Sequence, residues 1–323
     1  MLIIHRRETD PYFNIAAEEY LLKNFTEDIF TVWIDDPCLV VGKHQNTLAE
    51  INYRFIQDHA IPVIRRITGG GTVFHDHGNL NYSFITSGEP GKLVDYQKWT
   101  YPLISFMAGK GLYATLEDKS NLVIDGKKFS GNSAHVHRNR VIHHGTILYD
   151  SDLLLLKNSI KREREIYHDN AVKSRKAVVT NIRDHLGIKT AITDFSKDFL
   201  AFIKNNYPGS TIYKLNEDDH RLIRILADKK YRTWEWTYGY SPDYKLVNDF
   251  SFNGETWNIK MEVSKGIIID IAIRNNHGEH LEGFEKALHG VAHDENRILG
   301  LLQNANFTGN NVIEPLSIIQ YLF

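Results

Sequence analysis

RRITGGGTVFHDHGNLNYSF, residues 65–84, is the most informative stretch of this sequence. Two arginines and Thr68 lead into three consecutive glycines, and the run Thr72-Val73-Phe74 after them favours a strand. Three glycines allow a backbone to approach a ligand closely, because no Cβ intervenes and positive φ costs little. The N–H groups of such a turn form a concavity for anions, and a neighbouring arginine adds a charged fork for phosphate or carboxylate. We therefore expect an anion-binding turn at Gly69–Gly71.

Two well-known phosphate-binding patterns are excluded. No Gly-Lys-Ser/Thr follows the glycines, as a P-loop would require, and a β-branched and aromatic run stands where a dinucleotide-binding helix would begin. For these residues alone, the alternative interpretation is a glycine-rich hairpin turn with two exposed arginines.

Two further blocks accompany this stretch: GKKFSGN at residues 126–132 and HHGT at residues 143–146. Together, and in this order, the three blocks resemble the signature of lipoate–protein ligase A, in the lipoate/biotin ligase superfamily. The resemblance extends over the whole chain. It implies an α+β fold, with a large catalytic domain of mostly antiparallel sheets flanked by helices and a small α+β C-terminal domain.

The resemblance also implies a reaction in two steps. The carboxylate of lipoate or octanoate attacks the α-phosphate of ATP, which releases pyrophosphate and leaves an acyl-adenylate. A lysine of a carrier domain then attacks the activated carbonyl. The chemistry needs no protein nucleophile, only the placement of two anions and positive charge where oxyanion charge develops. The implied cofactors are ATP and Mg²⁺, and the implied partners are lipoyl domains of 2-oxoacid dehydrogenase E2 subunits or the glycine cleavage H protein.

The matched motifs assign roles to individual residues. Lys128, before Phe-Ser-Gly-Asn, matches the family lysine that contacts both the acyl carboxylate and the α-phosphate; a solvated hairpin lysine is the alternative. Lys127 should face the other way, because side chains alternate along a strand. His144 matches a histidine of the acyl pocket, with a hydrogen-bonded core histidine as the alternative. The matched positions for ATP or the adenylate are Arg65, Gly70, Gly71, Thr72, Val73, Lys128 and Ser133.

Other residues could support the site. Arg66 is either a second site residue or a surface ion-pair residue. His75 and Asp76 are expected to anchor the loop by hydrogen bonds rather than to act in catalysis, because neither reaction step demands a general base there. Asn121 stands where the family commonly carries an aspartate that meets Mg²⁺ or the adenylate, and an amide brings no charge to a metal. Asp118 or Asp125 could substitute, so the metal ligands stay open.

Composition narrows the class of protein. A chain of 323 residues with 42% hydrophobic and 24% charged residues is long enough for one large and one small globular domain. The net charge of −2 gives no electrostatic footprint for nucleic acid or an anionic membrane. The apolar run at the N-terminus is too short for a signal peptide or a spanning helix. We expect a cytoplasmic protein without a nucleic-acid or membrane partner.

Two rival functions remain. An octanoyl or lipoyl transferase of the same superfamily would need a reactive thiolate, and the only thiol, Cys38, follows Pro37 at the start of an apolar run that favours packing. A non-catalytic protein that binds an acyl group or adenylate is the other rival, and the presence of Lys128 counts against it. Pyrophosphate release with ATP and lipoate would separate the ligase from both.

Hydrophobic periodicity and turn-forming residues predict the helices and strands of the larger domain. We expect a helix capped by Asp10 with Ile15, Ala16, Tyr20 and Leu21 facing the core, and an early helix position or a kink at Pro102. Further helices are predicted over 48–60, 97–110, 151–167 and 194–206, and strands over 30–34, 39–41, 62–67 and 81–86. Residues 113–149 should be β, with turns at Asp125-Gly126 and Asn139-Arg140, and residues 171–182 should form a loop across the active face.

A domain boundary is predicted near Ser241-Pro242-Asp243, which gives a catalytic domain over 1–242 and an accessory domain over 247–323. The second domain should have β-β-β-α-α order, with turns at Asn253-Gly254 and Lys265-Gly266. Its helices are expected within 280–290 and 294–305.

Overall fold

The structure is a computed structural model that describes all residues except 89–90, 161–165, 253 and 305–314. The chain divides into two compact units, each assembled from three segments. The first comprises Met1–Lys43, Ile61–Ser159 and Ser174–Thr233, and the second comprises His44–Ala60, Ile160–Lys173 and Trp234–Phe323. The second unit thus includes two short segments from within the catalytic domain predicted over 1–242. The division into domains 1–242 and 247–323 stays a prediction.

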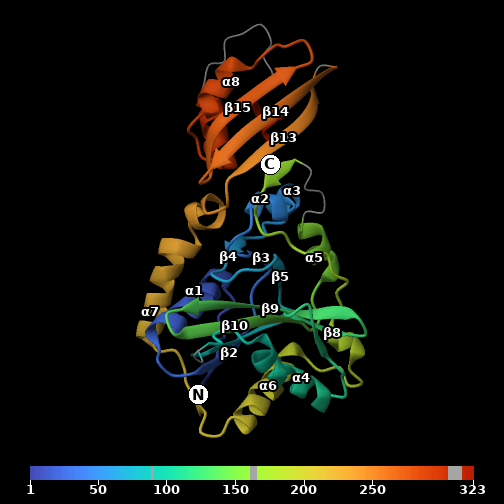
Figure 1. Ribbon diagram of the computed structural model, residues 1–323, viewed down its shortest axis with the longest axis vertical. Coiled ribbons are helices and arrows are strands. Elements are labelled where there is room, and N and C mark those ends of the chain that lie inside the picture. Colours follow the sequence, from blue (N-terminus) through green and yellow to red (C-terminus); the bar gives the residue numbers. More distant parts are fainter. Residues whose placement is uncertain (89–90, 161–165, 253, 305–314) are drawn as a thin grey trace. The chain divides into compact units, whose positions relative to one another are not determined.

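An eight-stranded sheet forms the centre of the first unit (Figure 1). Its strands, in spatial order, are β12 (Thr211–Ile212), β1 (Leu2–His5), β2 (Ile29–Trp33), β6 (Asn79–Ser87), β10 (Arg140–Leu148), β9 (Lys127–His137), β8 (Asn121–Ile124) and β7 (Thr115–Glu117). Only β1 pairs in parallel, with β2 and β12, among the described strands of this sheet. A small sheet has the order β4 (Val63–Arg65), β3 (Cys38–Val41) and β5 (Val73–His75). The prediction of an α+β fold with mostly antiparallel sheets is confirmed.

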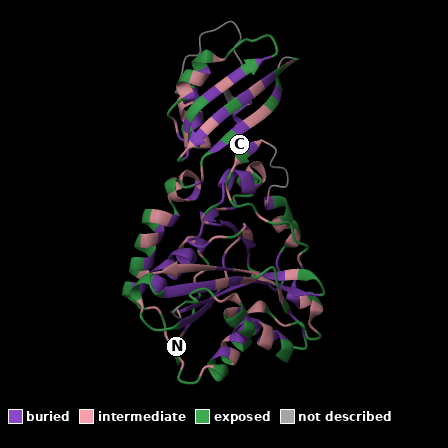
Figure 2. Cartoon of the chain, viewed as in Figure 1, coloured by how far each residue is buried: buried purple, intermediate pink, exposed green. Residues whose placement is uncertain are grey.

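The two faces of the large sheet have different characters. Helices α4 (Tyr96–Gly109) and α6 (Ile192–Asn206) cover one face, and α1 (Pro11–Asn24) lies on the other (Figure 1). The α4 and α6 face carries the main apolar core, in which Phe106 and Phe199 stack with ring centroids 4.9 Å apart. Most of the sheet is buried in Figure 2. Because neighbouring residues alternate between faces, Ser83 of β6 and His144 of β10 point toward α1, whereas His143 packs against α4.

Helix α1 begins as predicted. The side chain of Asp10 accepts a hydrogen bond from the Tyr12 N–H (3.0 Å), and Pro11 is the first helical residue. Its burial is broader than expected, however, because Asn14, Glu18 and Glu19 are buried together with the apolar residues. The predicted core positions Ile15, Ala16, Tyr20 and Leu21 are all buried, and the helix also places two carboxylates in the interior.

Two predicted helices are interrupted. Residues 48–60 form α2 (Thr47–Glu50) and α3 (Tyr53–Asp58), because Ile51 bridges to Ile160 and the Asn52 side chain caps α3 by accepting from Phe55 N–H. The helix predicted over 151–167 is α5 (Leu153–Ser159). Residues 161–165 of that prediction lie outside the described residues, and Tyr167 lies in strand β11 (Tyr167–Asp169).

Smaller differences concern Pro102, a turn and an unpredicted helix. Pro102 lies in the interior of α4, so the predicted early helix position is wrong. The second hairpin turns at Arg138-Asn139, one residue before the predicted pair, with Arg138 at φ +56°.

Helix α7 (Glu217–Leu226) was not predicted, although Asn216 and Asp219 form a capping box at its start. Two short π-helical segments follow, η2 (Ala227–Tyr231) and η3 (Glu235–Gly239), and the short 3₁₀ helix η1 spans Ile182–His185.

The second unit contains a four-stranded sheet in the order β11, β13 (Tyr244–Phe252), β14 (Glu255–Ser264) and β15 (Ile267–Asn275). The predicted turn at Lys265-Gly266 is confirmed by φ values of +50° and +75°, whereas Asn253 lies outside the described residues. The strands precede α8 (Glu282–Leu288), α9 (Glu295–Asn304) and an additional α10 (Pro315–Ile319). The predicted β-β-β-α-α order is confirmed.

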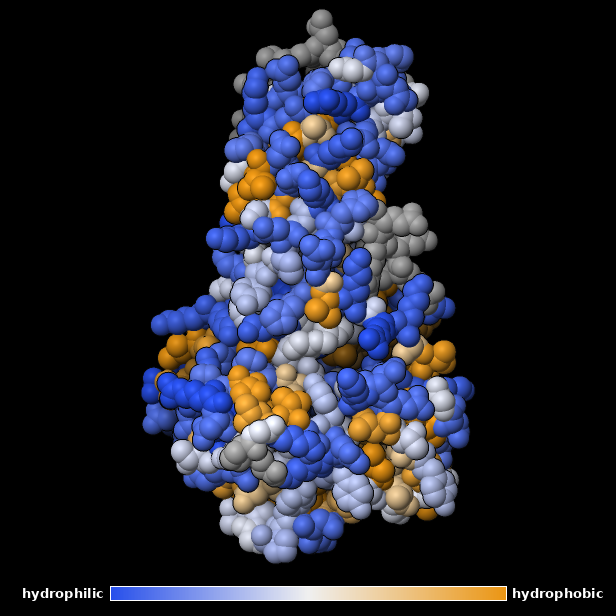
Figure 3. All heavy atoms as spheres, in the orientation of Figure 1, coloured by the Kyte–Doolittle hydropathy of each residue, from blue (hydrophilic) through white to orange (hydrophobic). Residues whose placement is uncertain are grey.

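No helix in the described ranges is long and apolar enough to cross a membrane. On the face drawn in Figure 3, hydrophobic residues are interspersed among hydrophilic ones.

A buried histidine fixes the end of the chain to the second unit. His293 is 1% exposed, and its Nε2 lies 2.7 Å from the Leu322 carbonyl oxygen. A carbonyl can only accept, so Nε2 carries the proton and Nδ1 accepts from the Tyr244 hydroxyl (2.6 Å). Phe323 stacks on the ring, with centroids 4.5 Å apart. Burial lowers the pKa of His293 to about 4, so the folded protein holds this ring neutral.

We expect this histidine to make stability pH-dependent. Its folded pKa lies below the unfolded value of 6.5, so its contribution is complete above that value and is lost as pH falls toward 4. The free energy of unfolding should fall by on the order of 1–2 kcal/mol between pH 7 and pH 5 from this group. Urea titrations at both pH values should give a smaller difference for His293→Gln than for the wild type. The exposed His277→Gln is the control, and equal pH dependence in all three proteins would contradict the assignment.

Candidate functional site

A buried arginine builds the glycine turn. Arg66 follows β4, and its Nε donates to Thr68 Oγ1 (2.8 Å) while its Nη1 donates to the Val40 carbonyl (3.0 Å). Its Nη2 donates to the carbonyls of Gly69 (2.6 Å) and Gly71 (2.8 Å). Arg66 is 5% exposed, and burial lowers its pKa to about 10. The alternatives of a turn with exposed arginines and of a surface ion pair are therefore wrong, because Arg66 is internal.

The neighbouring arginine is also buried. Arg65 is 0% exposed, and its Nη1 donates to the carbonyls of Gly42 and Lys43, both at 3.0 Å. The Lys43 N–H in turn donates to the Thr68 carbonyl (2.8 Å). These bonds tie the segment after β3 to the segment that leads into the glycines.

The glycines are required by both conformation and space. Gly70 has φ +90°, and a Cβ there would lie 3.1 Å from Arg66 Nη2. A Cβ on Gly71 would lie 2.9 Å from Ser174 Oγ and 3.1 Å from its Cα. The Ser174 hydroxyl accepts a hydrogen bond from Thr72 N–H (2.8 Å), and the Ser133 hydroxyl donates to the Gly69 carbonyl (2.8 Å). Ser133, a predicted site residue, thus contacts the turn, and so does Ser174, which the sequence reasoning missed.

Lys128 owes its orientation to a β-bulge. In the pairing of β8 with β9, Leu122 lies opposite Ser130 and Val123 opposite Lys128, so Phe129 is an extra residue. Phe129 is 0% exposed and joins the apolar core on the α4 and α6 face. The Lys128 side chain instead lies over Gly131, where a Cβ would be 3.0 Å from its Nζ. Lys127, next to it, is exposed.

The surroundings of Lys128 perturb its charge. Burial, followed by the positive charge of Arg66, lowers the pKa of Lys128, and Asp118 acts in the opposite direction. Within the described residues its ammonium group makes no hydrogen bond. Its backbone is held by the 171–182 loop, because Lys128 N–H donates to the Val178 carbonyl (2.8 Å) and Thr180 N–H donates to the Lys128 carbonyl (3.0 Å). The loop that carries Ser174 therefore lies along both the glycine turn and Lys128.

His144 is part of a polar row on the α1 face. It lies directly opposite Ser83 of β6 and Ser133 of β9, so the three side chains share this face. Its Nε2 lies 2.8 Å from Thr68 Oγ1, and its Nδ1 lies 2.9 and 3.0 Å from the two carboxylate oxygens of Glu18. Burial alone would raise the pKa of Glu18, but its contacts with His144 and the charge of Arg6 hold the value below normal.

His75 and Asp76 are both buried and hydrogen-bonded, but not to each other. His75 Nδ1 lies 2.7 Å from Asp35 Oδ2. Asp76 accepts from the N–H groups of Gly78 (2.9 Å) and Asp152 (2.8 Å). Each residue therefore connects the segment after the glycines to a different part of the first unit.

Asp35, Cys38 and His75 form the one cluster of potential metal-ligating side chains in the described part of the chain. Its ligand atoms lie within 4.8 Å of one another, and all three residues are buried. The Asp35 carboxylate also accepts from Asn14 (2.8 Å), Trp33 (3.1 Å) and Asn81 (3.1 Å), so its oxygens are already satisfied. Mg²⁺ prefers oxygen ligands and keeps several waters, which this dry cluster with a thiol and an imidazole does not offer. The cluster does not fit Mg²⁺.

Cys38 is not placed as a nucleophile. The residue is 0% exposed in β3. Burial, with a further contribution from Asp35, raises the pKa of its thiol well above the ordinary value. A protonated thiol without access to solvent is a weak nucleophile.

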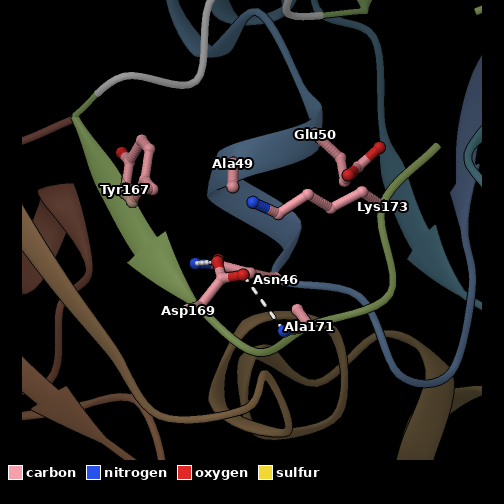
Figure 4. Close-up of a pocket in the computed structure, with 7 residues that line it drawn as sticks. All are labelled: Asn46, Ala49, Glu50, Tyr167, Asp169, Ala171 and Lys173. Atoms are coloured by element: carbon pink, nitrogen blue, oxygen red, sulfur yellow. Dashed lines mark hydrogen bonds between the residues drawn. The ribbon is translucent and has the colours of Figure 1, made fainter. Parts of the chain in front are cut away.

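A small pocket in the second unit does not involve any of these residues (Figure 4). There, the Asp169 carboxylate accepts from the Asn46 side chain and from the Ala171 N–H, both at 3.0 Å. Its wall is made by Asn46, Ala49, Glu50, Tyr167, Asp169, Ala171 and Lys173. The predicted residues that the structure brings together lie instead in the first unit, at the glycine turn and on β9 and β10. Asn121, the position at which an aspartate was expected from the family resemblance, lies opposite Gly131 in the β8–β9 pairing, close in register to Lys128.

Known proteins resemble this chain throughout. The sequence pattern of the lipoyl protein ligase A/B catalytic domain matches residues 10–204. Lipoate–protein ligase 1 of Staphylococcus aureus is 36% identical over 291 residues, which cover 88% of each chain. Lipoate-protein ligase LplJ of Bacillus subtilis is 31% identical over 313 residues, which cover 95% of this chain and 94% of the relative.

Solved structures share the fold. The crystal structure of LipL1 from P. falciparum in complex with lipoate has a TM-score of 0.63 at 19% identity, covering 99% of this chain and 98% of the other. The crystal structure of a lipoate-protein ligase A bound with ATP also has a TM-score of 0.63, at 22% identity, and the match covers 74% of this chain and 98% of the other. The match of the catalytic-domain pattern and the identity to curated relatives over most of the length establish the family: this chain belongs to the lipoyl protein ligase A/B family.

Proposed function

We propose that the protein is an ATP-dependent lipoate–protein ligase, which activates lipoate or octanoate as an acyl-adenylate and transfers the acyl group to a lysine of a carrier domain. The observation that carries the proposal is the position of Lys128, turned by the bulge toward the face that also holds Ser133 and the glycine turn. The names of the relatives support it, because the S. aureus and B. subtilis proteins are lipoate–protein ligases.

In the first step, we propose that the backbone of Gly70–Val73 binds the nucleotide phosphates, while the buried Arg65 contributes positive charge and holds the Gly42 and Lys43 carbonyls rather than touching the phosphates. The Lys128 ammonium would contact both the acyl carboxylate and the α-phosphate, which reduces the repulsion between the two anions. A carboxylate oxygen forms a bond to the α-phosphorus, and the bond to the β-phosphate oxygen breaks. The products are the acyl-adenylate and pyrophosphate. His144 would line the acyl subsite, while Arg66, His75 and Asp76 act as the supports that hold the turn.

In the second step, the neutral amine of a carrier lysine attacks the acyl carbonyl. The C–N bond forms, the C–O bond to AMP breaks, and the amine loses a proton. The Lys128 charge would stabilise the developing oxyanion at the carbonyl oxygen and then the AMP that leaves. The Lys128 ammonium suits this contact, because it makes no hydrogen bond to a fixed partner among the described residues.

We propose that Mg²⁺ binds to the site together with ATP. The buried Asp35 cluster does not fit it, whereas Asp118 lies close enough to Lys128 to influence its pKa and is exposed. Mg²⁺ is commonly held by substrate phosphates with one or two carboxylates. We therefore propose Mg-ATP as the substrate, with Asp118 and Asn121 as candidate oxygen donors from this chain.

The acceptor would be the lipoyl domain of a 2-oxoacid dehydrogenase E2 subunit or the glycine cleavage H protein, in the cytoplasm. One structural neighbour, from Thermoplasma acidophilum, is described as a bipartite lipoate protein ligase with its E2 lipoyl domain, which supports a carrier of this kind. Residues 247–323 are proposed to act as the accessory domain of the ligase.

Replacement of Lys128 should abolish adenylate formation. We expect Lys128→Ala to lower the rate of pyrophosphate release from ATP and lipoate several-hundred-fold, since loss of one well-placed charged contact costs about 3–4 kcal/mol in the transition state. The exposed neighbour Lys127→Ala is the matched control and should retain most activity. Similar rates for the two variants would remove Lys128 from this role, with circular dichroism confirming that both are folded.

The cysteine should be dispensable. Because Cys38 is buried with a raised pKa, Cys38→Ser should keep ligase activity at a packing cost of about 1 kcal/mol in stability. Mass spectrometry during turnover should find no acyl group on the enzyme. A thioester on Cys38 would favour the transferase mechanism instead.

The glycine turn should be needed for nucleotide binding. In Gly70→Val, a Cβ at φ +90° would press on Arg66 Nη2 and disturb the turn, so we expect ATP affinity to fall at least about tenfold by isothermal titration. Gly111 has φ +82° and nothing within 4 Å of its Cβ position, so Gly111→Val imposes the same backbone strain elsewhere in the first unit. If both variants bind ATP equally well, the glycines serve the turn alone.

A further inference from the structure

One continuous chain of hydrogen bonds joins helix α1, strand β10 and the glycine turn. It runs from the Glu18 carboxylate to His144 Nδ1 (2.9 Å), and from His144 Nε2 to Thr68 Oγ1 (2.8 Å). Arg66 Nε then donates to the same hydroxyl oxygen (2.8 Å). Glu18 is 1% and Thr68 0% exposed, so solvent does not compete for these bonds.

The direction of each bond follows from the donors and acceptors at its ends. Arg66 can only donate, so the Thr68 oxygen is the acceptor of that bond. The Glu18 carboxylate can only accept, so His144 Nδ1 carries a proton. The Thr68 hydroxyl hydrogen is then available for Nε2, an arrangement in which one ring proton on Nδ1 satisfies every bond of the chain. A second proton on Nε2 would turn the buried Thr68 hydroxyl toward another acceptor, which is costly in the interior.

Arg66, at the other end of this chain of hydrogen bonds, also holds the glycine turn. Its Nη2 holds the carbonyls of both Gly69 and Gly71, while its Nε is fixed by Thr68. Arg66 and His144 therefore share one hydroxyl group. A change in the position of the His144 ring must alter the Thr68 hydroxyl, and through it the guanidinium that shapes the turn.

We propose that Thr68 is a positioning residue that couples the acyl subsite at His144 to the phosphate-binding turn, so that the two substrates influence each other's binding. The inference rests on the proposed function, in which His144 meets the acyl group and the turn meets ATP. Coupling of this kind is reciprocal: the factor by which lipoate changes nucleotide affinity equals the factor by which nucleotide changes lipoate affinity.

The first unit contains a second buried arginine–threonine pair, which serves as a matched control for a substitution of Thr68. Arg6 Nε donates to Thr31 Oγ1 (3.1 Å), and both residues are buried. Arg6 lies over the Trp33 ring, 3.6 Å from its centroid. Thr31→Val thus removes the same arginine-to-threonine bond as Thr68→Val, without a histidine on the hydroxyl. Any general cost of that loss should appear in both variants.

The experiment measures this coupling. Isothermal titration of Mg²⁺ with α,β-methylene ATP, which cannot react at the α-phosphate, is done with and without saturating lipoate, and the titration of lipoate is done with and without the nucleotide. We expect the coupling factor of Thr68→Val to fall at least about fivefold toward 1. Thr68→Ser, which keeps the hydroxyl, and Thr31→Val should retain the wild-type factor. A wild-type factor in Thr68→Val, or none in the wild type although both ligands bind, would overturn the inference.

A second measurement requires neither ligase activity nor a folded Thr68→Val variant. ¹⁵N NMR of the wild type, with His144→Gln for assignment, should find His144 neutral with Nδ1 protonated and Nε2 as acceptor. A proton on Nε2 would overturn the proposed chain even if Thr68→Val cannot be prepared. Failure of the wild type to bind either substrate would overturn the proposed function instead, and the NMR result would still decide the direction of the hydrogen bonds.

Discussion

The site depends on a charge held in the interior. A buried guanidinium is costly unless its N–H groups are satisfied, and Arg66 satisfies them with one hydroxyl and three backbone carbonyls. Those carbonyls include Gly69 and Gly71, so the arginine and the turn stabilise each other. With its carbonyls committed to Arg66, the turn can offer N–H groups to a ligand. The positive charge also remains near enough to lower the pKa of Lys128, which links the two halves of the site.

The two faces of the large sheet carry different residues: one face holds the apolar core and the other holds the polar residues of the candidate site. Its α4 and α6 face carries an apolar core in which aromatic rings such as Phe84, Phe106 and Phe199 pack with aliphatic side chains. Its α1 face carries the polar row of Ser83, Ser133 and His144. Because α1 brings Glu18 into the interior above this row, a helix that is buried all round has a polar role as well as a packing role.

Short-range signals in the sequence were reliable. The cap at Asp10, the hairpin turns after Asp125 and Lys265 and the glycine turn all follow from residue types that dictate local backbone conformation. The family blocks identified Lys128 and His144. The partners of these residues could not be predicted in the same way, because Glu18 and His144 are 126 residues apart and only the folded sheet brings them together. Helix α7 was missed although Asn216 and Asp219 carried a usable signal. The extra residue in β9 could not be predicted because it is defined by the pairing with β8, which the sequence of one strand does not show.

That bulge has a consequence for how this strand can vary among related proteins. Substitutions between Lys127 and Gly131 change one side chain at a time, whereas a one-residue deletion or insertion away from the bulge would reverse which side chains face the core. At Phe129 itself, a deletion would leave Lys128 opposite Val123 and Ser130 opposite Leu122 in regular alternation, so the faces would be kept and only the buried Phe129 ring would be lost. Within the segment from the Asp125-Gly126 turn to Gly131, a change of length should therefore be tolerated best at the extra residue and least at the positions on either side of it.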